Sequence, residues 1–429
     1  MKLTLKNIGK IGTALVEING ITVIAGENNT GKSTVGKALY CLFSAFHDIN
    51  DKIVKERSQS VYRTIYSLLR KRYTSIDIDS VVIRKITEEI CKNRTKYIEN
   101  SYELKNYFER IYETFNANDI SAESVAEEDI DMIFNKVLSY LKLEDNTIKA
   151  NVLKNILQSE FNMQISNVNS NELLSLLTLE FHGEKSIDVE VENNEVINIK
   201  FSTDIYSNLA YLEDPFVIDE LENNLPLRFI RPENHRTKLI GMITQKRNRS
   251  IVSNVIEEMV VSEKLDQIFD ILNHICEGTL IKKEDSYVYT SSKYNVPLAL
   301  SNISTGFKTF LILKTLLLNG AIEEGGTIIL DEPEIHLHPE WQLVFAELIV
   351  LIHREFGIHV LLNTHSPYFL NAIEVYAAKH GVGDKCKYYL ASSQDDNVSI
   401  IKDVTNNIEA IYSKLARPLQ DLENERGHL

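Results

Sequence analysis

Gly26-Glu27-Asn28-Asn29-Thr30-Gly31-Lys32-Ser33-Thr34 is the stretch of this chain that decides the fold. It matches the P-loop pattern of Gly, four residues and Gly-Lys-Ser, and we call residues 26–34 the P-loop. An apolar run at 21–24 precedes it and apolar residues at helical spacing follow it, which predicts a strand, a loop and a helix. A P-loop needs these neighbours because backbone N–H groups and a helix N-terminus must converge on one phosphate. We therefore predict an α/β nucleotide-binding core.

Each residue type in the P-loop has a chemical task. The glycines let backbone N–H groups close around the β-phosphate, and Lys32 is placed to bridge the β- and γ-phosphates. Ser33 is expected to give its hydroxyl to Mg²⁺, with Thr34 on the α-phosphate side. The predicted nucleotide contacts within the loop are Gly26, Asn28, Asn29, Thr30, Gly31, Lys32, Ser33 and Thr34.

The order of elements along the chain indicates a core interrupted by an insertion. Asn19-Gly20 separates two short apolar runs, which predicts a hairpin between 15–18 and 21–24. Charged, Asn-rich helical segments fill residues 47–175, and strand signals return at 177–181, 187–191 and 196–201. Helices are predicted at 251–275 and from Pro339, followed by a buried strand at 358–362. We expect residues 1–46 and 176–429 to form the core, with 47–175 as a mostly helical insertion.

One acidic run in the insertion has two readings. Glu127-Glu128-Asp129-Ile130-Asp131 could supply metal ligands, but such runs are usually a solvated helix face. We favour the solvated face.

Bulk composition narrows the setting of the protein. Lys and Arg total 46 against 61 Asp and Glu, so the formal net charge is -15 and most of the surface is unsuited to wrapping nucleic acid. Cys41, Cys91, Cys276 and Cys386 form no Cys-x-x-Cys pair, which argues against a disulfide framework or zinc hook. The N-terminus reads as a strand rather than a signal peptide, and no apolar run is long enough to span a bilayer. We expect a soluble cytoplasmic protein with no membrane partner.

Three downstream motifs complete the chemistry that the P-loop begins. An apolar strand ends in Asp331-Glu332, where Asp331 can hold Mg²⁺ and Glu332 can polarise the attacking water. Ser304-Thr305-Gly306 precedes a helix, and it is either an ordinary cap or a helix N-terminus aimed at a γ-phosphate. His365 ends the next strand, where a γ-phosphate sensor would lie. With a P-loop in the same chain we favour the functional reading of all three.

His336-x-His338 suggests a metal pair or a loop at a subunit interface. We favour the interface loop, because no further ligand stands at metal-binding spacing.

The motifs resemble those of the ABC-type ATPases of the RecF, SMC and OLD kind. Asp331 to Pro339 is similar to that group's Walker B and D-loop, Ser304 to Lys308 to its signature motif, and Thr364 to Pro367 to its switch-histidine segment. The resemblance implies ATP and Mg²⁺ as cofactors, slow ATP hydrolysis, and a head-to-tail dimer. In that dimer Ser304 and Gly306 of one subunit would cover the ATP bound by Lys32 of the other. The chain departs from the group in lacking an obvious Q-loop glutamine, for which Asn234 and Gln245 are the candidates.

A finer resemblance links the chain to prokaryotic antiviral operons. Its tail, 407–423, looks like that of the PtuA family of Septu defence ATPases, which work with a separate HNH nuclease. The stretch after His365 is too short for the Toprim nuclease of OLD proteins. The resemblance implies an ATP-driven switch that controls a partner nuclease. The alternative is a RecF/SMC-like repair or chromosome-maintenance ATPase that acts directly on DNA.

A basic stretch keeps DNA as a candidate partner. It either forms a solvated charged face or tracks a nucleic-acid backbone. Its members are Arg228, Arg231, His235, Arg236, Lys238, Lys246, Arg247 and Arg249.

Overall fold

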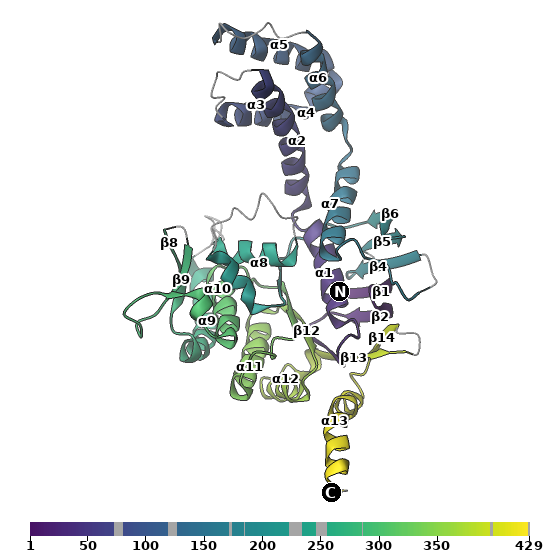
Figure 1. Cartoon of the computed structure of the whole chain (residues 1–429), viewed down its shortest axis with the longest axis vertical. Helices are drawn as coiled ribbons and strands as arrows, with labels where there is room; N and C mark the ends of the chain where they lie inside the picture. Colours follow the sequence, from purple (N-terminus) through teal and green to yellow (C-terminus); the bar gives the residue numbers. More distant parts are fainter. Residues whose placement is uncertain are drawn as a thin grey trace. The chain divides into compact units, whose positions relative to one another are not determined.

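The chain folds into two compact units. The structure is a computed structural model that describes residues 1–72, 80–118, 127–170, 174–183, 185–222, 234–245, 255–284, 286–394 and 398–427 (Figure 1). Residues 1–47 and 153–429 form one unit, the core unit, and residues 48–152 form the other, the helical unit. The second boundary therefore lies at 152/153, whereas we had expected 175. The reason is that the last turns of α7 (Asp145–Glu160) bury Leu153, Ile156 and Leu157, and the Cys41 thiol of α1 (Lys32–Phe46) lies 4.0 Å from the Ile156 carbonyl oxygen.

One mixed sheet organises the core unit. Within the described residues it has eleven strands, in the order β6-β5-β4-β1-β2-β14-β13-β3-β12-β11-β7. Strands β13, β3, β12, β11 and β7 run parallel to one another, and they are the part of the sheet that positions the site. The strands are β1 (Lys2–Ile8), β2 (Ile11–Glu17), β3 (Ile21–Gly26), β4 (Leu174–Glu180), β5 (Ser186–Glu192), β6 (Glu195–Phe201), β7 (Leu209–Leu212), β11 (Thr327–Asp331), β12 (His359–Thr364), β13 (Cys386–Ser393) and β14 (Ser399–Asp403).

The predicted hairpin at Asn19-Gly20 is wrong. Strand β2 pairs with β1 and β14, while β3 pairs with β13 and β12, so β13 and β14 lie between the two runs. Gly20 is needed for another reason: its φ is +91°, and a Cβ there would lie 2.3 Å from the Lys385 carbonyl oxygen. The actual hairpin turns at Gly9-Lys10, between β1 and β2.

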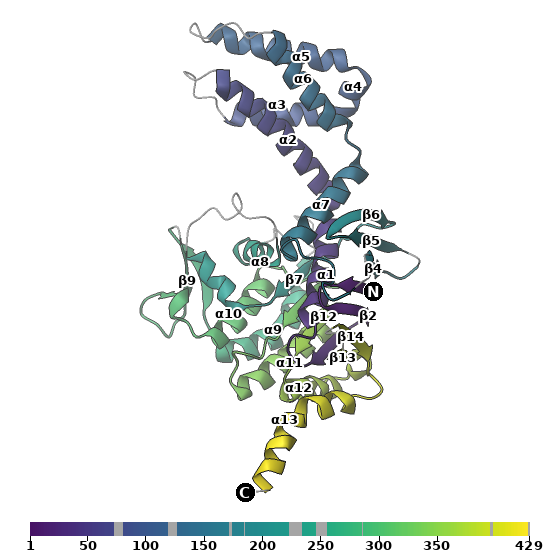
Figure 2. The same ribbon diagram turned by 45° about the vertical axis from the view of Figure 1, so that its right-hand side comes forward.

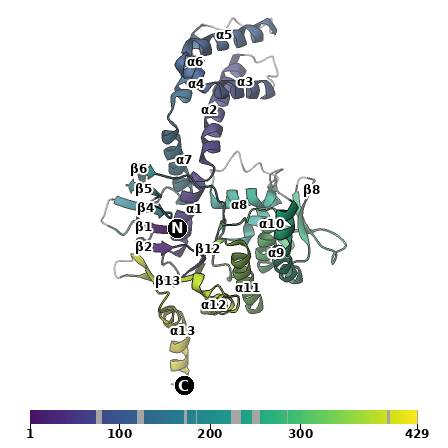
Figure 3. The same cartoon turned by 180° about the vertical axis from the view of Figure 1, so that it is seen from behind.

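Helices pack around this sheet and bury a large apolar core. The helix predicted from Pro339 and the strands predicted at 177–201 and 358–362 are confirmed. Figures 2 and 3 show α9 and α10 at the opposite end of the core unit from β4–β6. The remaining elements of the core unit are η1 (Pro215–Leu221), α8 (His235–Thr244), α9 (Val255–Ile275), β8 (Thr279–Lys283), β9 (Ser286–Thr290), β10 (Leu298–Ala299), η3 (Leu300–Asn302), α10 (Thr305–Leu318), α11 (Pro339–Phe356), α12 (Pro367–Lys379), η4 (Gly383–Lys385) and α13 (Glu409–Gly427).

The helical unit has its own small apolar core. Buried residues such as Val61, Leu104 and Leu141 pack together there. Arg57 is also buried; its guanidinium donates to Asp145 (2.8 Å) and to the carbonyl oxygens of residues 140 and 143. Its helices are α2 (Ile49–Arg72), α3 (Ser80–Lys92), α4 (Arg94–Glu99), α5 (Ser101–Asn118), α6 (Glu127–Lys142) and the first part of α7.

The acidic run begins α6. Its Asp131 forms an ion pair with Lys105 at 2.7 Å, and the described residues hold no group of three or more His, Cys, Asp or Glu side chains suited to a metal. Asp131 thus has an ion-pair partner, and the solvated face stays a prediction for the run as a whole. No helix in the described ranges is both long and apolar enough to cross a membrane.

A buried lysine fastens α10 to the segment that follows α9. Lys314 is 4% exposed, and its ammonium donates to the carbonyl oxygens of Cys276 (2.6 Å), Glu277 (2.9 Å) and Gly278 (2.9 Å). We expect Lys314→Met to lower the free energy of unfolding by about 2–4 kcal/mol, because those carbonyls lose a charged donor. Urea denaturation would measure it. Lys282→Met, at an exposed lysine of β8, is the control, and an equal loss in both variants would contradict this role.

Candidate functional site

The parallel register brings the predicted motifs to one edge of the sheet. Asp331 at the end of β11 lies beside Asn363 of β12, and Thr364 lies beside Ala25 of β3, just before the P-loop. The P-loop, Asp331-Glu332 and His365 all follow carboxyl ends of these strands. In open α/β sheets this edge is where ligands bind.

The P-loop is folded in a form that leaves little room for larger residues. Gly31, at φ +81°, begins α1, and a Cβ there would lie 2.9 Å from the Ile11 side chain. Lys32 is only 4% exposed, and its ammonium donates to the carbonyl oxygens of Gly26 (3.1 Å) and Glu27 (2.9 Å). The lysine charge is therefore held at the mouth of the loop.

Glu332 lies between the P-loop and His365. Its Oε1 lies 3.5 Å from the Lys32 ammonium and 3.4 Å from Nδ1 of His365. Glu332 has φ +49°, a left-handed conformation that costs a non-glycine residue energy and that often marks a functional site. The structure thus brings two predicted residues, Lys32 and His365, to the carboxylate of a third, Glu332.

Asp331 is buried beneath them in a polar setting. Its two oxygens accept hydrogen bonds from the Asn363 amide (3.0 Å) and the Tyr211 hydroxyl (3.1 Å), and Ser33 also bonds to it. Burial raises the pKa of Asp331, since the ionised form loses its hydration. A hydroxyl and one carboxylate, completed by phosphate oxygens and water, are the donors that Mg²⁺ prefers, so Ser33 and Asp331 fit this ion.

Several residues of this edge escaped the sequence reading. Glu334 is 2% exposed; it accepts a hydrogen bond from the Thr364 hydroxyl and another from the His365 backbone N–H (3.4 Å). Burial raises the pKa of Glu334. This carboxylate thereby fixes the backbone at the end of β12 that carries the histidine. Tyr211 and Asn363 were also missed, because their value depends on a strand neighbour that no local motif reveals.

Ser304 and Gly306 lie at a different place. Ser304 precedes α10, and its side chain makes no capping hydrogen bond. A Cβ at Gly306 would lie 2.6 Å from the His336 carbonyl oxygen, so the glycine permits a close backbone approach. Together with Thr305, His336, His338 and Trp341 these residues line a cavity of about 470 Å³, and no P-loop residue lines it. Ser304 and Gly306 therefore share a cavity with the His336 loop and not with the P-loop.

His336 and His338 both face this cavity. The His336 ring packs edge-on against Phe216, with 5.8 Å between ring centroids. The choice between an interface loop and a metal pair stays a prediction.

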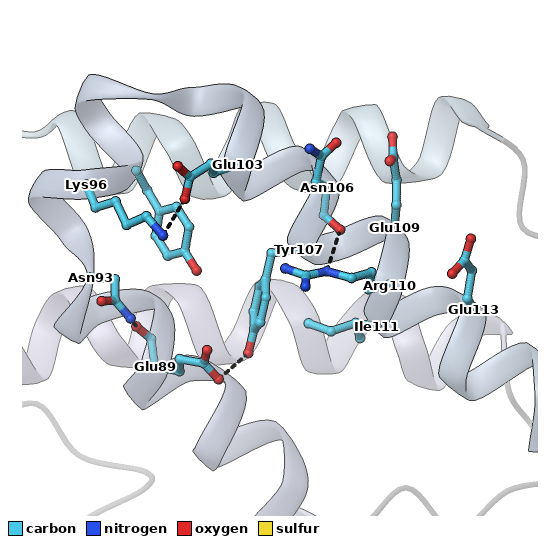
Figure 4. Close-up of a pocket in the computed structure, with 11 residues that line it drawn as sticks. Glu89, Asn93, Lys96, Glu103, Asn106, Tyr107, Glu109, Arg110, Ile111 and Glu113 are labelled. Atoms are coloured by element: carbon cyan, nitrogen blue, oxygen red, sulfur yellow. Dashed lines mark hydrogen bonds and ion pairs between the residues drawn. The ribbon is translucent and has the colours of Figure 1, made fainter.

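Another cavity, of about 870 Å³, lies in the helical unit (Figure 4). Many of its polar side chains bond to neighbours within it: Lys96 to Glu103, and the Tyr107 hydroxyl to Glu89 at 2.7 Å. It contains none of the predicted site residues.

The basic stretch is described only in part. Arg228, Arg231, Lys246, Arg247 and Arg249 lie outside the described residues. Arg236 contacts Asp214 (3.4 Å), Glu220 (3.8 Å) and Glu213 (3.9 Å), so its charge is compensated within the protein. The nucleic-acid track stays a prediction for the undescribed members.

The two Q-loop candidates lie at opposite ends of α8. The Asn234 side chain accepts from the Thr237 N–H (3.0 Å) in a capping box, and Gln245 ends α8.

Comparisons with known proteins agree with the motifs. The model of the family described as "AAA domain, putative AbiEii toxin, Type IV TA system" matches residues 21–371. Endonuclease GajA of Bacillus cereus (strain HuB5-5) is 22% identical over 385 residues, which cover 82% of this chain and 52% of GajA. The retron Ec83 probable ATPase of Escherichia coli is 31% identical over 103 residues, 21% of this chain and 18% of that protein. The chain thus spans about half the length of GajA and less than a fifth of the retron protein.

Solved structures with some likeness include heads of SMC proteins. The SMC head bound to the C-winged helix domain of ScpA has a TM-score of 0.46 at 12% identity, covering 94% of this chain and 96% of that one. The SMC head domain from Thermotoga maritima has a TM-score of 0.38 at 11% identity, covering 94% and 98%. At these scores the likeness carries no argument of its own.

Lys32 offers the most direct test of the site. We expect Lys32→Ala to weaken binding of a fluorescent ATP analogue at least about tenfold, because the phosphates lose a desolvated ammonium. Fluorescence titration would measure it. Lys387→Ala, at a half-exposed lysine paired with Glu17, is the control for the loss of one charge. Equal affinities in the two variants would remove Lys32 from the site.

Proposed function

The chain belongs to the family described as an AAA domain and putative AbiEii toxin of type IV toxin–antitoxin systems, and we propose that it is the ATP-driven switch subunit of a prokaryotic antiviral system. Its fold is the α/β P-loop ATPase fold of ABC type that the sequence predicts, with a mostly helical insertion. One observation carries the proposal: Lys32, Glu332 and His365 meet at the sheet edge, while Ser304 and Gly306 line a separate cavity.

Hydrolysis would begin when Lys32 changes partners. In the structure its ammonium is shared between two P-loop carbonyl oxygens and Glu332. Phosphate oxygens would replace these acceptors, which frees the Glu332 carboxylate to orient and polarise a water molecule. His365, at 3.4 Å from Glu332, is positioned to contact the γ-phosphate and that water. Mg²⁺ held by Ser33 and Asp331 would supply charge stabilisation for the phosphate oxygens.

A second copy of the chain would complete the site. The N-terminus of α10 carries a partial positive charge, and the Ser304 hydroxyl is not used for capping. Gly306 lets the start of α10 lie close to the His336 carbonyl oxygen, where a Cβ would be only 2.6 Å away. We propose that these groups close over the ATP held by the partner's P-loop, so that binding and hydrolysis close and open the dimer.

The target of this switch is proposed to be a separate nuclease, of the HNH type that the Septu resemblance implies. One relative is named as an endonuclease and another as a retron ATPase, which supports a link between this ATPase type and nucleic-acid cleavage systems. An adjacent nuclease gene would favour this proposal over direct action on DNA. The charge of Arg236 is compensated within the protein, so this residue gives the direct-DNA alternative no support.

Glu332→Gln separates ATP binding from hydrolysis. We expect the variant to bind ATP with near-normal affinity and to hydrolyse it at least about a hundredfold more slowly, because the amide cannot serve as the proton acceptor. Phosphate release with and without Mg²⁺ would be measured beside a binding titration. Glu340→Gln, at the start of α11, is a control of equal charge change. Turnover by Glu332→Gln at the rate of the unaltered protein would exclude Glu332 as the base.

A further inference from the structure

His235 lies in a buried cluster that the proposed mechanism does not yet use. Its Nδ1 is 2.6 Å from Glu160 Oε1 and its Nε2 is 2.9 Å from Glu213 Oε2. Its backbone N–H also donates to Glu160 at 3.1 Å. The imidazole is 6% exposed and Glu160 is 4% exposed, so water competes little for these bonds.

The cluster is charged and tightly held. A protonated imidazole between two carboxylates donates from both ring nitrogens, and its charge is balanced by theirs. Burial by itself lowers the pKa of His235, but the bonds to Glu160 and Glu213 outweigh it and raise that pKa. The bond to His235 is also the main cause that lowers the pKa of Glu213. Each charge in the cluster is therefore compensated by a neighbour.

Two chains of contacts connect His235 to the edge of the sheet that carries Asp331 and Glu332, which we call the acidic edge. Glu213 directly follows β7, and because Leu212 lies beside Leu330 in the parallel register, Glu213 is level with Asp331. Glu213, Asp331 and Glu332 all line one small cavity of about 70 Å³. The second path runs through Tyr211, whose ring lies 4.5 Å from the His235 ring and whose hydroxyl bonds to Asp331.

The contact of His235 with Glu160 connects it to helix α7. Glu160 is the last residue of α7, the helix by which the chain enters the core unit from residues 48–152. Both carboxylate oxygens of Glu160 bond to His235, so this histidine connects the end of α7 to the edge of the sheet.

We infer that His235 is a positioning residue of the proposed ATP site. It is anchored by Glu160 at the end of α7, and it fixes the positions of Glu213 and Tyr211 beside Asp331. A divalent ion held by Ser33 and Asp331 would then bind beside side chains whose positions are fixed by His235. Any shift of the end of α7 would change the affinity of the acidic edge for the ion. This inference rests on the proposed function, because it assumes that Mg²⁺ and nucleotide bind at this edge.

The test measures how much Mg²⁺ is needed for tight binding of a fluorescent ATP analogue, and it needs no turnover. We expect His235→Gln to raise the half-saturating Mg²⁺ concentration about tenfold, as loss of a residue that orients a metal ligand typically does. Glu160→Gln, remote from the edge, should raise it in the same direction by about threefold. Binding without Mg²⁺ should stay unchanged in both variants.

His353→Gln is the matched control. His353 is also a buried histidine of the core unit, with its Nδ1 2.7 Å from the Ile358 carbonyl oxygen, and it is not among the residues lining the acidic cavity. Its substitution should lower the unfolding temperature without moving the Mg²⁺ dependence. If His235→Gln and Glu160→Gln are folded and need no more Mg²⁺ than the unaltered chain, the inference is wrong while the proposed function stands. If the unaltered chain shows no Mg²⁺-dependent binding that Lys32→Ala abolishes, both fall together.

If His235→Gln and Glu160→Gln do not fold, Tyr211→Phe still tests the inference. It removes only the hydroxyl bonded to Asp331 and leaves the ring against His235. We expect it to raise the Mg²⁺ requirement severalfold, and an unchanged requirement in this variant would also contradict the inference.

Discussion

The parallel pairing of β3, β12, β11 and β7 is the constraint on which the rest of the structure depends. Parallel strands end at the same edge, so loops that are hundreds of residues apart in sequence meet there. Asp331 pairs with Asn363 and Leu330 pairs with Leu212, and this register fixes which residue of each strand lies at that edge. A slip of one residue would turn Asp331 to the other face of the sheet and remove it from the P-loop.

The parallel pairing also explains how several charged side chains can be buried at this edge. Lys32, Asp331 and Glu334 are each at most 5% exposed, and each has hydrogen-bonding partners from a neighbouring strand or loop. A buried charge without such partners would destabilise the fold. The same partners hold the residues in place for a ligand, so stability and the proposed chemistry rest on one set of contacts.

Local motifs could be predicted from the sequence, while their neighbours could not. The P-loop, Asp331-Glu332 and His365 follow apolar runs that reveal their strands, and the order of those runs was enough to expect them at one edge. The Asn19-Gly20 hairpin was predicted wrongly, because the strands that separate β2 from β3 come from residues after 385. Glu334 and Tyr211 escaped notice, and His235 was assigned to a basic stretch, because their roles depend on partners that only the sheet register or a distant helix provides.

The central claim is that ATP is hydrolysed at a site shared by two copies of the chain. Mixing Lys32→Ala with Ser304→Arg tests it most directly, since a mixed dimer contains one site with an intact P-loop and an intact Ser304. Each variant alone should be inactive in phosphate release. An equimolar mixture should recover about a quarter of the unaltered rate, because half of the dimers are mixed and each has one working site. No recovery in mixtures whose mixed dimers are demonstrated by mass measurement would contradict the shared site.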